Sequence, residues 1–404
     1  MKGRGLVPIS DLIGGALPAG VKPPSTATRP AQSKTRDQKP RTTWPDAAGL
    51  ARFEALRTPV EIARALFRYR DPDLRTRLAR HHPNQRAASQ ALTAIDQLEQ
   101  QDAVPPEGES PRPLTRRPPT GEAQLDLLVP FPHDIASKDA IRLMECAPFR
   151  LSKRPSPTQK QLTYVLGSAI VEFTPNSSLG LPTAKDYDFV QFICSHLQEA
   201  VNRGDIPDRT FLARGHEFLR FARRDQGGKQ HTQIEPMIDR LQGTMVKRYA
   251  LGPNGEKGPP EWLPLVGYTK IMSYTPSGKV DQIRVDIPLW IYEAVVGNSV
   301  RGDKPHVLTL NRDYFLLNAS LDRFLYRFAR HRAGKGSTVV ALPDLHKRSG
   351  STRDLRHFRS YLKKLPDGRV LEYRFQIRNS RRQENVHIDY TADDGEGEGS
   401  TAGA

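Results

Sequence analysis

The feature that most constrains the fold of this chain is a pattern that occurs twice: three short helical segments followed by a β-hairpin. Helical spacing of apolar residues, strand alternation and turn residues come in the same order in both copies. Three helices and a hairpin form the winged variant of the helix-turn-helix, whose third helix enters the major groove of DNA. The pattern therefore predicts an α+β chain with two tandem winged-helix domains.

The first copy begins with a predicted helix over 184–201, in which apolar residues recur at four-residue spacing. A second helix is expected from Thr210, which is a good N-cap. A third is expected from Thr232, because Glu235 three residues later completes a capping box. Alternating residues over 268–287, interrupted by a Thr-Pro-Ser-Gly turn, predict the hairpin.

The second copy begins near Leu321 with apolar residues in the i, i+3, i+4, i+7 pattern of a helix. A short second helix is expected over 342–348. The third is expected from Ser351, with Asp354 at the capping-box position. Alternating strands within 371–390 complete the hairpin.

The charge of the chain is strongly positive, with a formal net charge of +16. Most of the excess lies in 319–382, which holds 17 Lys and Arg residues and five Asp and Glu residues. Such a balance favours a polyanionic partner, either nucleic acid or an acidic membrane surface. No apolar run reaches the roughly 18 residues of a membrane span. We therefore expect a cytoplasmic protein that binds DNA and has no membrane partner.

The third helix of the second copy is the predicted DNA-reading element, because its apolar residues fall on one side and leave a basic side for DNA. Arginine can bond two acceptors on guanine at once, whereas phosphate contacts set the register. Arginines in the hairpin loop would lie against phosphates or the minor groove. The candidates of this copy are Arg353, Arg356, His357, Arg359, Ser360, Lys363 and Lys364 on the helix, Lys347 and Arg348 before it, and Arg381 and Arg382 in the hairpin loop.

The first copy is less basic, and its candidate residues for DNA binding are fewer. Lys229, Gln233 and Arg240 lie in or beside its third helix, and Lys247 follows that helix. Such side chains suit base edges and phosphates. The alternative is an ordinary solvated surface, where the same residue types are common.

Composition divides the chain into six expected parts. Segments rich in Pro, Gly, Ser or charge bury too little apolar surface to offset chain entropy. The parts are 1–45, a disordered basic arm; 46–103, a helical region; 104–125, a Pro-rich linker; 126–300 and 301–390, the two winged-helix domains; and 391–404, a disordered acidic tail. The helical region could be a small bundle or a self-association segment, and the sequence does not choose between them.

Motifs of enzymes that act on DNA or nucleotides are missing from the sequence. It contains no His-x-His pair of a nicking metal site, no His-x-x-Arg motif of a tyrosine recombinase and no P-loop. The nucleophile elbow Gly-x-Ser-x-Gly is also missing. Two cysteines, Cys146 and Cys194, are too few for a disulfide framework or a thiolate zinc site. We expect a protein that is not an enzyme and has no catalytic residues, cofactor or metal.

Four motifs, in one order within about 160–380, resemble the plasmid replication initiator protein A family. They are Leu181–Asp188, Arg240–Thr244, Val307–Phe315 and His346–Thr352, the last followed by Leu355, Phe358 and Arg359. The resemblance leaves 1–125 uncovered. It implies an initiator built from tandem winged-helix domains, in agreement with the duplicated pattern.

The resemblance also implies a function and a set of partners. Such a protein binds repeated sites, expected to be direct repeats, in double-stranded plasmid origin DNA and promotes origin opening. It would associate with itself, with the plasmid or nucleoid, and with host proteins: the host initiator and the replicative helicase or its loader. Two other hypotheses stay open: a winged-helix transcriptional repressor, which could regulate its own gene, and a scaffold for RNA or a membrane surface.

Overall fold

The central element of the fold is the helix α5 (Ala184–Asn202), which confirms the helix predicted over 184–201. Thr183 Oγ1 accepts a hydrogen bond from the Asp186 amide (3.1 Å), and the Asp186 carboxylate accepts one from the Thr183 amide (2.7 Å). This capping box fixes where α5 begins. Of its 19 side chains, 16 are buried. A helix that is covered on all sides has to be surrounded by other elements of the chain.

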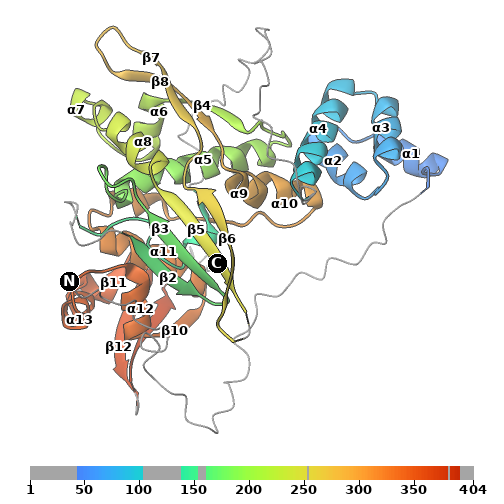
Figure 1. Ribbon diagram of the computed structural model, residues 1–404. Helices are drawn as coiled ribbons and strands as arrows, with labels where there is room; N and C mark the ends of the chain where they lie inside the picture. The colour runs from blue at the N-terminus through green and yellow to red at the C-terminus, as the bar shows by residue number, and fades with distance from the viewer. Residues whose placement is uncertain (1–42, 103–137, 153–160, 253, 381–382, 392–404) are drawn as a thin grey trace, which may run out of the picture. The chain divides into compact units, whose positions relative to one another are not determined.

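Figure 1 shows the computed structural model, which describes residues 43–102, 138–152, 161–252, 254–380 and 383–391. The linker 104–125 lies outside the described residues, as do nearly all of the basic arm and the acidic tail. The predicted disorder of these segments and the domain boundaries therefore stay predictions. Among the described helices, none combines the length and the apolar character needed to cross a lipid bilayer.

The predicted helical region is confirmed within residues 43–102. It consists of α1 (Ala47–Glu54), α2 (Pro59–Phe67), α3 (Pro72–His81) and α4 (Gln85–Asp102). The side chains of Asp46, Thr58 and Asp71 accept hydrogen bonds at the starts of the first three helices. Because α2 packs on α4 through buried residues such as Ile62 and Ile95, the region forms a small bundle. A role in self-association stays a hypothesis.

The first copy contains two antiparallel sheets in addition to α5. One sheet has the strand order β2-β3-β5-β6, and the other has the order β4-β8-β7. The elements are β2 (Leu162–Leu166), β3 (Ala169–Thr174), β4 (Thr210–Arg214), α6 (Gly215–Phe221), α7 (Gly228–His231), α8 (Ile234–Gln242), β5 (Met245–Leu251), β6 (Lys257–Pro264), β7 (Thr269–Tyr274) and β8 (Val280–Asp286). The predicted hairpin over 268–287 is confirmed as β7 and β8, and α9 (Leu289–Tyr292), the π-helical turn η3 (Glu293–Gly297) and α10 (Asn298–Arg301) follow it.

The helix predicted from Thr210 is wrong over its first five residues, because Thr210–Arg214 is strand β4. Phe211 and Ala213 are buried while Leu212 is exposed, which is the alternation of a strand rather than the spacing of a helix. Pairing of β4 with β8 supplies its backbone hydrogen bonds. The helix begins at Gly215 instead.

The capping box predicted at Thr232 is also wrong. Thr232 has helical backbone angles at the end of α7, and its hydroxyl donates a hydrogen bond to the Lys229 carbonyl (2.9 Å). An N-cap residue has an extended backbone, so Thr232 with its helical angles cannot fill that role. Helix α8 begins two residues later at Ile234, without a side-chain cap.

The second copy forms one antiparallel sheet with the strand order β10-β13-β12-β11, and helices lie against it. Its elements are η4 (Arg312–Leu316), α11 (Ser320–Arg332), β10 (Ser337–Ala341), α12 (Leu342–Ser349), α13 (Leu355–Lys363), η5 (Pro366–Gly368), β11 (Arg369–Val370), β12 (Tyr373–Asn379) and β13 (Glu384–Tyr390). Before this copy, β9 (Val307–Thr309) pairs with β1 (Lys138–Ala140), which leads into η2 (Ile141–Leu143). All three predicted helices of this copy and its hairpin are present, and β10 was not predicted.

The start of the third helix was predicted four residues too early. Gly350 ends α12 in the left-handed conformation (φ 65°), and the chain needs Ser351–Arg353 to turn before α13 begins at Leu355. Asp354 is therefore the N-cap itself rather than the third residue of a capping box. Its Oδ1 accepts a hydrogen bond from the His357 amide (2.9 Å).

Both copies have the same general order of elements: a helix, a strand, further helices (α6, α7 and α8 in the first copy, α12 and α13 in the second), then a hairpin. In both, the strand after the first helix pairs with the second strand of the hairpin, as β4 does with β8 and β10 with β13. The first copy differs because β5 and β6 are inserted before its hairpin and belong to a separate sheet, in which β5 pairs with β3 and β6 pairs with β5. The chain is thus a mixed α+β protein, as its sequence predicted.

The turn between α12 and α13 is packed against strand β2. Tyr164 Oη donates a hydrogen bond to the Ala147 carbonyl (2.8 Å), and the Ala147 amide donates one to the Arg348 carbonyl (3.1 Å). A side chain at Gly350 would overlap the Tyr164 hydroxyl. Glycine is required here both by the positive φ and by this contact.

We predict that Gly350→Ala lowers the free energy of unfolding by more than Gly334→Ala. Gly334 has a similar φ of 59°, and no atom lies near a Cβ added there. Gly334→Ala therefore measures the backbone cost alone, which is about 1–2 kcal/mol. Gly350→Ala adds the overlap with Tyr164, which costs about 1–3 kcal/mol more. Urea unfolding of the two variants measures the difference, and equal losses would contradict the contact.

Candidate nucleic-acid interface

The helix α13 has one apolar and one basic side. Phe358 and Leu362 are buried, with exposed fractions of 2% and 3%, and they pack toward α12 and β12. The opposite side carries Arg356, Ser360 and Lys363, which lie three or four residues apart and therefore on one face. This arrangement presents basic side chains to solvent from a helix that is held by its apolar side.

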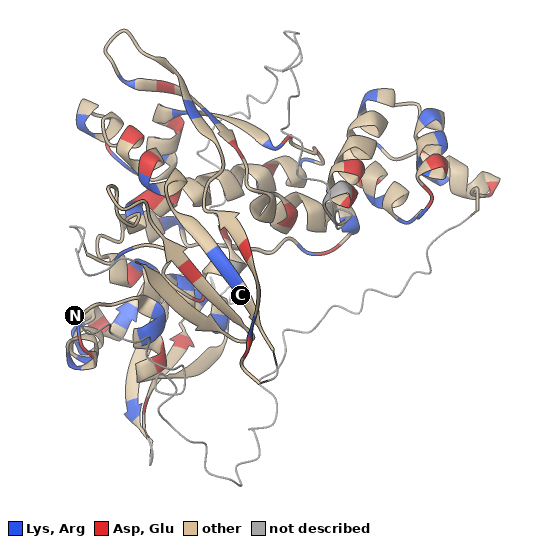
Figure 2. Cartoon of the chain, in the orientation of Figure 1, with Lys and Arg blue, Asp and Glu red and all other residues tan. Residues whose placement is uncertain are grey.

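Most of the residues predicted to bind DNA in the second copy are exposed, and they come together on α12, α13 and the turn between them (Figure 2). The exposed ones are Lys347, Arg353, Arg356, His357, Ser360, Lys363 and Lys364. Two others are already engaged in ion pairs, namely Arg348 with Glu145 (3.2 Å) and Arg359 with Glu384. Arg381 and Arg382 lie outside the described residues.

The ion pair between Arg359 and Glu384 joins α13 to strand β13. The Arg359 side chain is 42% exposed, and its guanidinium is paired with Glu384 of the hairpin. The pair fixes the helix and the hairpin relative to each other. A contact of Arg359 with a base would require this guanidinium to leave Glu384 or to share it.

Sequence reasoning did not select the basic residues on the strands of the second copy. Arg369 and Arg374 face each other across β11 and β12, and Arg378 is exposed near the hairpin loop. In β12 these arginines alternate with the inward residues Tyr373 and Phe375. That alternation was visible in the sequence and could have indicated an outer basic face of the hairpin.

In the first copy, the four predicted residues do not form one surface. Lys229 and Gln233 are exposed, at α7 and at the start of α8. Arg240 is occupied by the Asp186 carboxylate through two hydrogen bonds, of 2.8 and 3.0 Å. Lys247 is not beside the helix, because it lies on β5 in the other sheet.

The hairpin of the first copy also carries residues that were not selected. Lys270 on β7 is paired in register with Arg284 on β8, and both point away from the buried residue Ile283. Tyr268, just before β7, and Met272 on β7 are exposed, at 57% and 48%. The period-two alternation of this hairpin was recognised in the sequence, but its outward residues were not treated as candidates.

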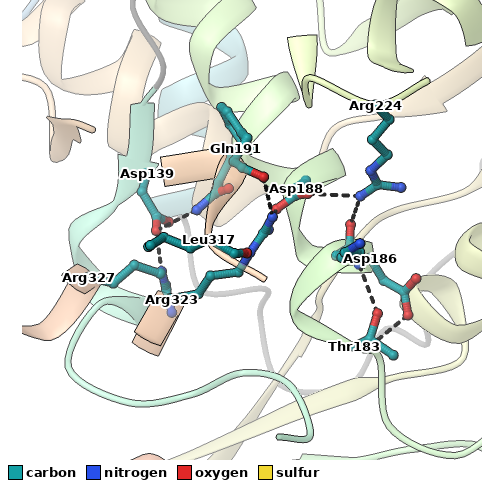
Figure 3. A network of polar contacts seen from close by, with 11 residues as sticks. Asp139, Thr183, Asp186, Asp188, Gln191, Arg224, Leu317, Arg323 and Arg327 are labelled. Atoms are coloured by element: carbon teal, nitrogen blue, oxygen red, sulfur yellow. Dashed lines mark hydrogen bonds and ion pairs between the residues drawn. The ribbon is translucent and has the colours of Figure 1, made fainter. Parts of the chain in front are cut away.

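A buried network of ion pairs connects α5 and β1 with α11 (Figure 3). The Asp139 carboxylate pairs with Arg327 and accepts hydrogen bonds from Tyr187 Oη (2.9 Å) and Gln191 Nε2 (3.0 Å). The side chains of Asp139 and Arg327 are both fully buried. Burial alone would lower the pKa of Arg327, but the Asp139 carboxylate keeps it above the ordinary value.

A second buried carboxylate, Asp188, holds two arginines at once. It pairs with Arg323 of α11 and with Arg224 Nη2, which lies 2.8 Å away. Arg323 also donates hydrogen bonds to the carbonyls of Phe315 (2.9 Å) and Leu317 (2.8 Å). Arg323 and Arg327 are therefore structural, although they contribute to the positive charge counted in 319–382.

The Glu145 carboxylate connects α11 to the end of α12. It lies 3.1 Å from His331 Nε2, 3.4 Å from Arg332 and 3.2 Å from Arg348. The hydrogen bond from His331 and the two guanidinium groups lower the pKa of Glu145 to about 2. Glu145 and His331 also line a mainly apolar cavity of about 310 Å³ between η2 and the sheet β2-β3-β5-β6.

Comparison with known protein families matches residues 138–374 to the model of replication initiator protein A. The match spans more than half of the chain. The chain belongs to the replication initiator protein A family. The resemblance inferred from the four motifs is thereby confirmed.

The matched span of this replication initiator begins at β1 and ends in β12, so it includes the buried network and α13. The motif Leu181–Asp188 supplies Asp186, Tyr187 and Asp188, all of which hold side chains of other elements. The small bundle of residues 43–102 lies outside the match. The family assignment therefore rests on the two copies and the contacts between them.

Individual proteins and structures similar to this replication initiator were also found. One is a protein of Wigglesworthia glossinidia brevipalpis named "Putative replication protein", which is 24% identical over 206 residues, or 50% of this chain and 71% of that protein. A crystal structure of domains 2 and 3 of RctB aligns with a TM-score of 0.43 and 13% identity, covering 62% of this chain and 99% of that chain. A second RctB structure of these domains aligns with a TM-score of 0.38 and 14% identity, covering 63% of this chain and 98% of that chain.

We predict that Arg327→Met lowers the free energy of unfolding by about 3–5 kcal/mol, because it leaves the Asp139 carboxylate buried without its cation. The double variant Asp139→Asn with Arg327→Met should recover part of this loss, since no buried charge remains. Arg223→Met is the matched control, because its ion pair with Asp313 is 40% and 58% exposed. That variant should cost less than about 1 kcal/mol. Denaturant unfolding measures all three, and equal losses for Arg327→Met and Arg223→Met would disprove a structural role for the network.

Proposed function

We propose that this chain is a plasmid replication initiator that binds repeated sites in a plasmid origin through two winged-helix domains. The supporting observation is α13, whose apolar side is buried while its basic side faces solvent beside a basic hairpin. The family assignment supports the role in replication. The protein acts in this proposal by binding rather than by catalysis, in the cytoplasm and on the plasmid.

The order of elements supports the assignment of both copies to the winged-helix class. In each, helices precede a hairpin whose second strand pairs with an earlier strand, as a wing does beside its recognition helix. By this assignment α8 and α13 are the recognition helices, and the hairpins β7–β8 and β12–β13 are the wings. The second domain carries more exposed basic residues, so it is the stronger electrostatic anchor.

The exposed residues divide into two proposed roles. Arg356 lies in the first turn of α13, the part of a recognition helix that contacts base edges, and its guanidinium suits guanine. Lys363 at the other end of the helix, and Lys347 on α12, suit phosphates. In the first domain, Lys270 and Arg284 on the wing contact the backbone of the neighbouring DNA segment.

Origin opening and recruitment of host proteins complete the proposal. Several bound copies strain an adjacent A·T-rich stretch, which is cheap to deform. The small bundle of residues 43–102 lies outside both DNA-binding domains and is available for self-association or for a host initiator, a helicase or its loader.

We predict that Arg356→Ala weakens binding to origin DNA by about 1–3 kcal/mol and reduces the preference over random duplex. Lys363→Ala should weaken binding to origin DNA and to random duplex by the same factor, because a phosphate contact carries no sequence information. Arg52→Ala, which removes an exposed arginine from α1, is the control and should leave the affinity for both duplexes unchanged. Gel-shift titrations against both duplexes separate these outcomes.

The same titrations give the dependence on salt. With roughly six to ten phosphates contacted, raising the salt from 50 to 200 mM should lower the affinity by about 10³–10⁵-fold. An affinity that does not depend on the salt concentration would contradict an interface made by basic side chains.

We also predict that a plasmid carrying only the origin replicates when the protein is supplied in trans, and that Arg356→Ala abolishes or reduces this replication. Plasmid copy number measures the effect. Failure of the origin-only plasmid together with repression of a promoter beside the origin would favour a repressor over an initiator.

A further inference from the structure

The sheet β2-β3-β5-β6 has one buried face and one exposed face. The buried face carries core residues such as Val171, Phe173 and Val246. On the other face, Val165 is 60% exposed, Trp262 is 59% exposed and Met245 is 42% exposed. Large apolar side chains gathered on a solvent-facing sheet mark a binding surface more often than a neutral one.

Lysines and aromatic rings alternate on this exposed face. Lys247 on β5 is paired in register with Trp262 on β6, and its Nζ lies 5.2 Å from the Trp262 ring centroid and 5.1 Å from that of Tyr249. Lys257 Nζ lies 4.5 Å from the centroid of Tyr249. Each amine is thus placed over a ring, where the attraction between cation and π-system holds it. Two aromatic rings and two ammonium groups form one patch.

The charged residues of this patch favour an anion. Glu172 on β3 faces the same side, where it lies 3.4 Å from Lys257 Nζ. The next acid along β6, Glu261, lies opposite Arg248 on the other side of the sheet, with the two groups 3.5 Å apart. Lys247 and Lys257 therefore outnumber the acid on the exposed face. The basic segment of β5 and the acid on β3 are both visible in Figure 2.

One edge of this sheet, formed by β6, is closed to another strand. β6 is an edge strand, and Pro259, Pro260 and Pro264 lie within it. Proline has no amide N–H to donate, so β6 cannot pair regularly with a strand from a second chain. Beside Trp262, the face rather than the β6 edge is therefore the part of the sheet that can take a partner.

We propose that the exposed face of β5 and β6 binds single-stranded DNA, with bases stacked on Trp262 and Tyr249 and phosphates beside Lys247 and Lys257. Exposed rings interleaved with basic side chains are the surface that binds single strands without sequence preference. A duplex cannot use the rings in this way, because its base faces are already stacked. The inference rests on the proposed function, since origin opening is the step that exposes a single strand.

Fluorescence anisotropy of a labelled oligo-dT, titrated with the full-length protein, tests the proposal. Trp262→Ala should weaken this binding by about 5- to 150-fold, the range expected for the loss of one stacked base. Lys247→Ala should weaken it and reduce its dependence on salt. Arg248→Ala is the matched control, because it removes a cation from the next residue of β5 on the other face. It should leave the affinity nearly unchanged.

Tryptophan fluorescence gives a second, independent measurement. Of the three tryptophans, Trp262 is 59% exposed, Trp290 is 6% exposed and Trp44, just before α1, is partly buried, so stacking of thymine should quench mainly Trp262. Trp262→Phe should remove most of the quenching and keep most of the affinity, because phenylalanine also stacks. A purely structural role of Trp262 would not produce this difference.

Gel shifts with duplex origin DNA separate failure of this inference from failure of the proposed function. Normal duplex binding by Trp262→Ala and Lys247→Ala, with unchanged affinity for oligo-dT, would overturn only the inference. A change in the sedimentation coefficient of these two variants, without a change in their binding to oligo-dT, would also overturn the inference. It would indicate that the face is an interface between copies of the chain. Loss of duplex binding by the wild-type protein would contradict the proposed function itself.

Discussion

The structure depends on the neutralisation of carboxylates in and beside a fully enclosed helix. α5 carries Asp186 and Asp188 among its buried residues, and Asp139 on β1 lies against it. A buried carboxylate is costly unless a cation and hydrogen-bond donors surround it. Arg323 and Arg327 provide these for Asp188 and Asp139, and both belong to α11. The first helix of the second copy is therefore held by the acids of the first, so the two copies are not independent units.

This constraint gives the positive charge of the C-terminal region two separate uses. Arg323, Arg327 and, in part, Arg348 are turned inward, where they hold α11 and α12 to acidic partners. Arg356 and Lys363 on α13 remain in solvent. The inward arginines position the sheet and helices that carry the outward ones. A net charge counts both groups together and overstates the charge that a ligand meets.

The elements that sequence predicted well are those whose pattern is local. α5, α11 and the two hairpins have apolar spacing that stands out within a single segment. β4 was missed because five residues are too few to distinguish a strand from the start of the helix that follows it. β6 was missed because its prolines argue against a strand, and only its place at the edge of a sheet permits them.

The location of the candidate site was predicted from the sequence, but the ion pairs that occupy particular residues were not. Exposure of Arg356 followed from the apolar stripe of α13. The occupation of Arg240 by Asp186 did not, because those residues are 54 positions apart, and Asp139 and Arg327 are 188 apart. Pairings at such distances depend on tertiary structure, which periodicity does not encode. The lysine and aromatic patch was missed for the same reason, since its members meet only when β5 and β6 pair.

In the proposed function several copies gather on a short length of DNA, and the prolines of β6 then have a further consequence. Crowding brings open sheet edges into frequent collision, and such edges can grow into ordered aggregates. A strand that lacks amide donors at Pro259, Pro260 and Pro264 offers no template for this growth. By this proposal the chain reaches a high local density on a plasmid while the β6 edge stays inert toward neighbouring molecules.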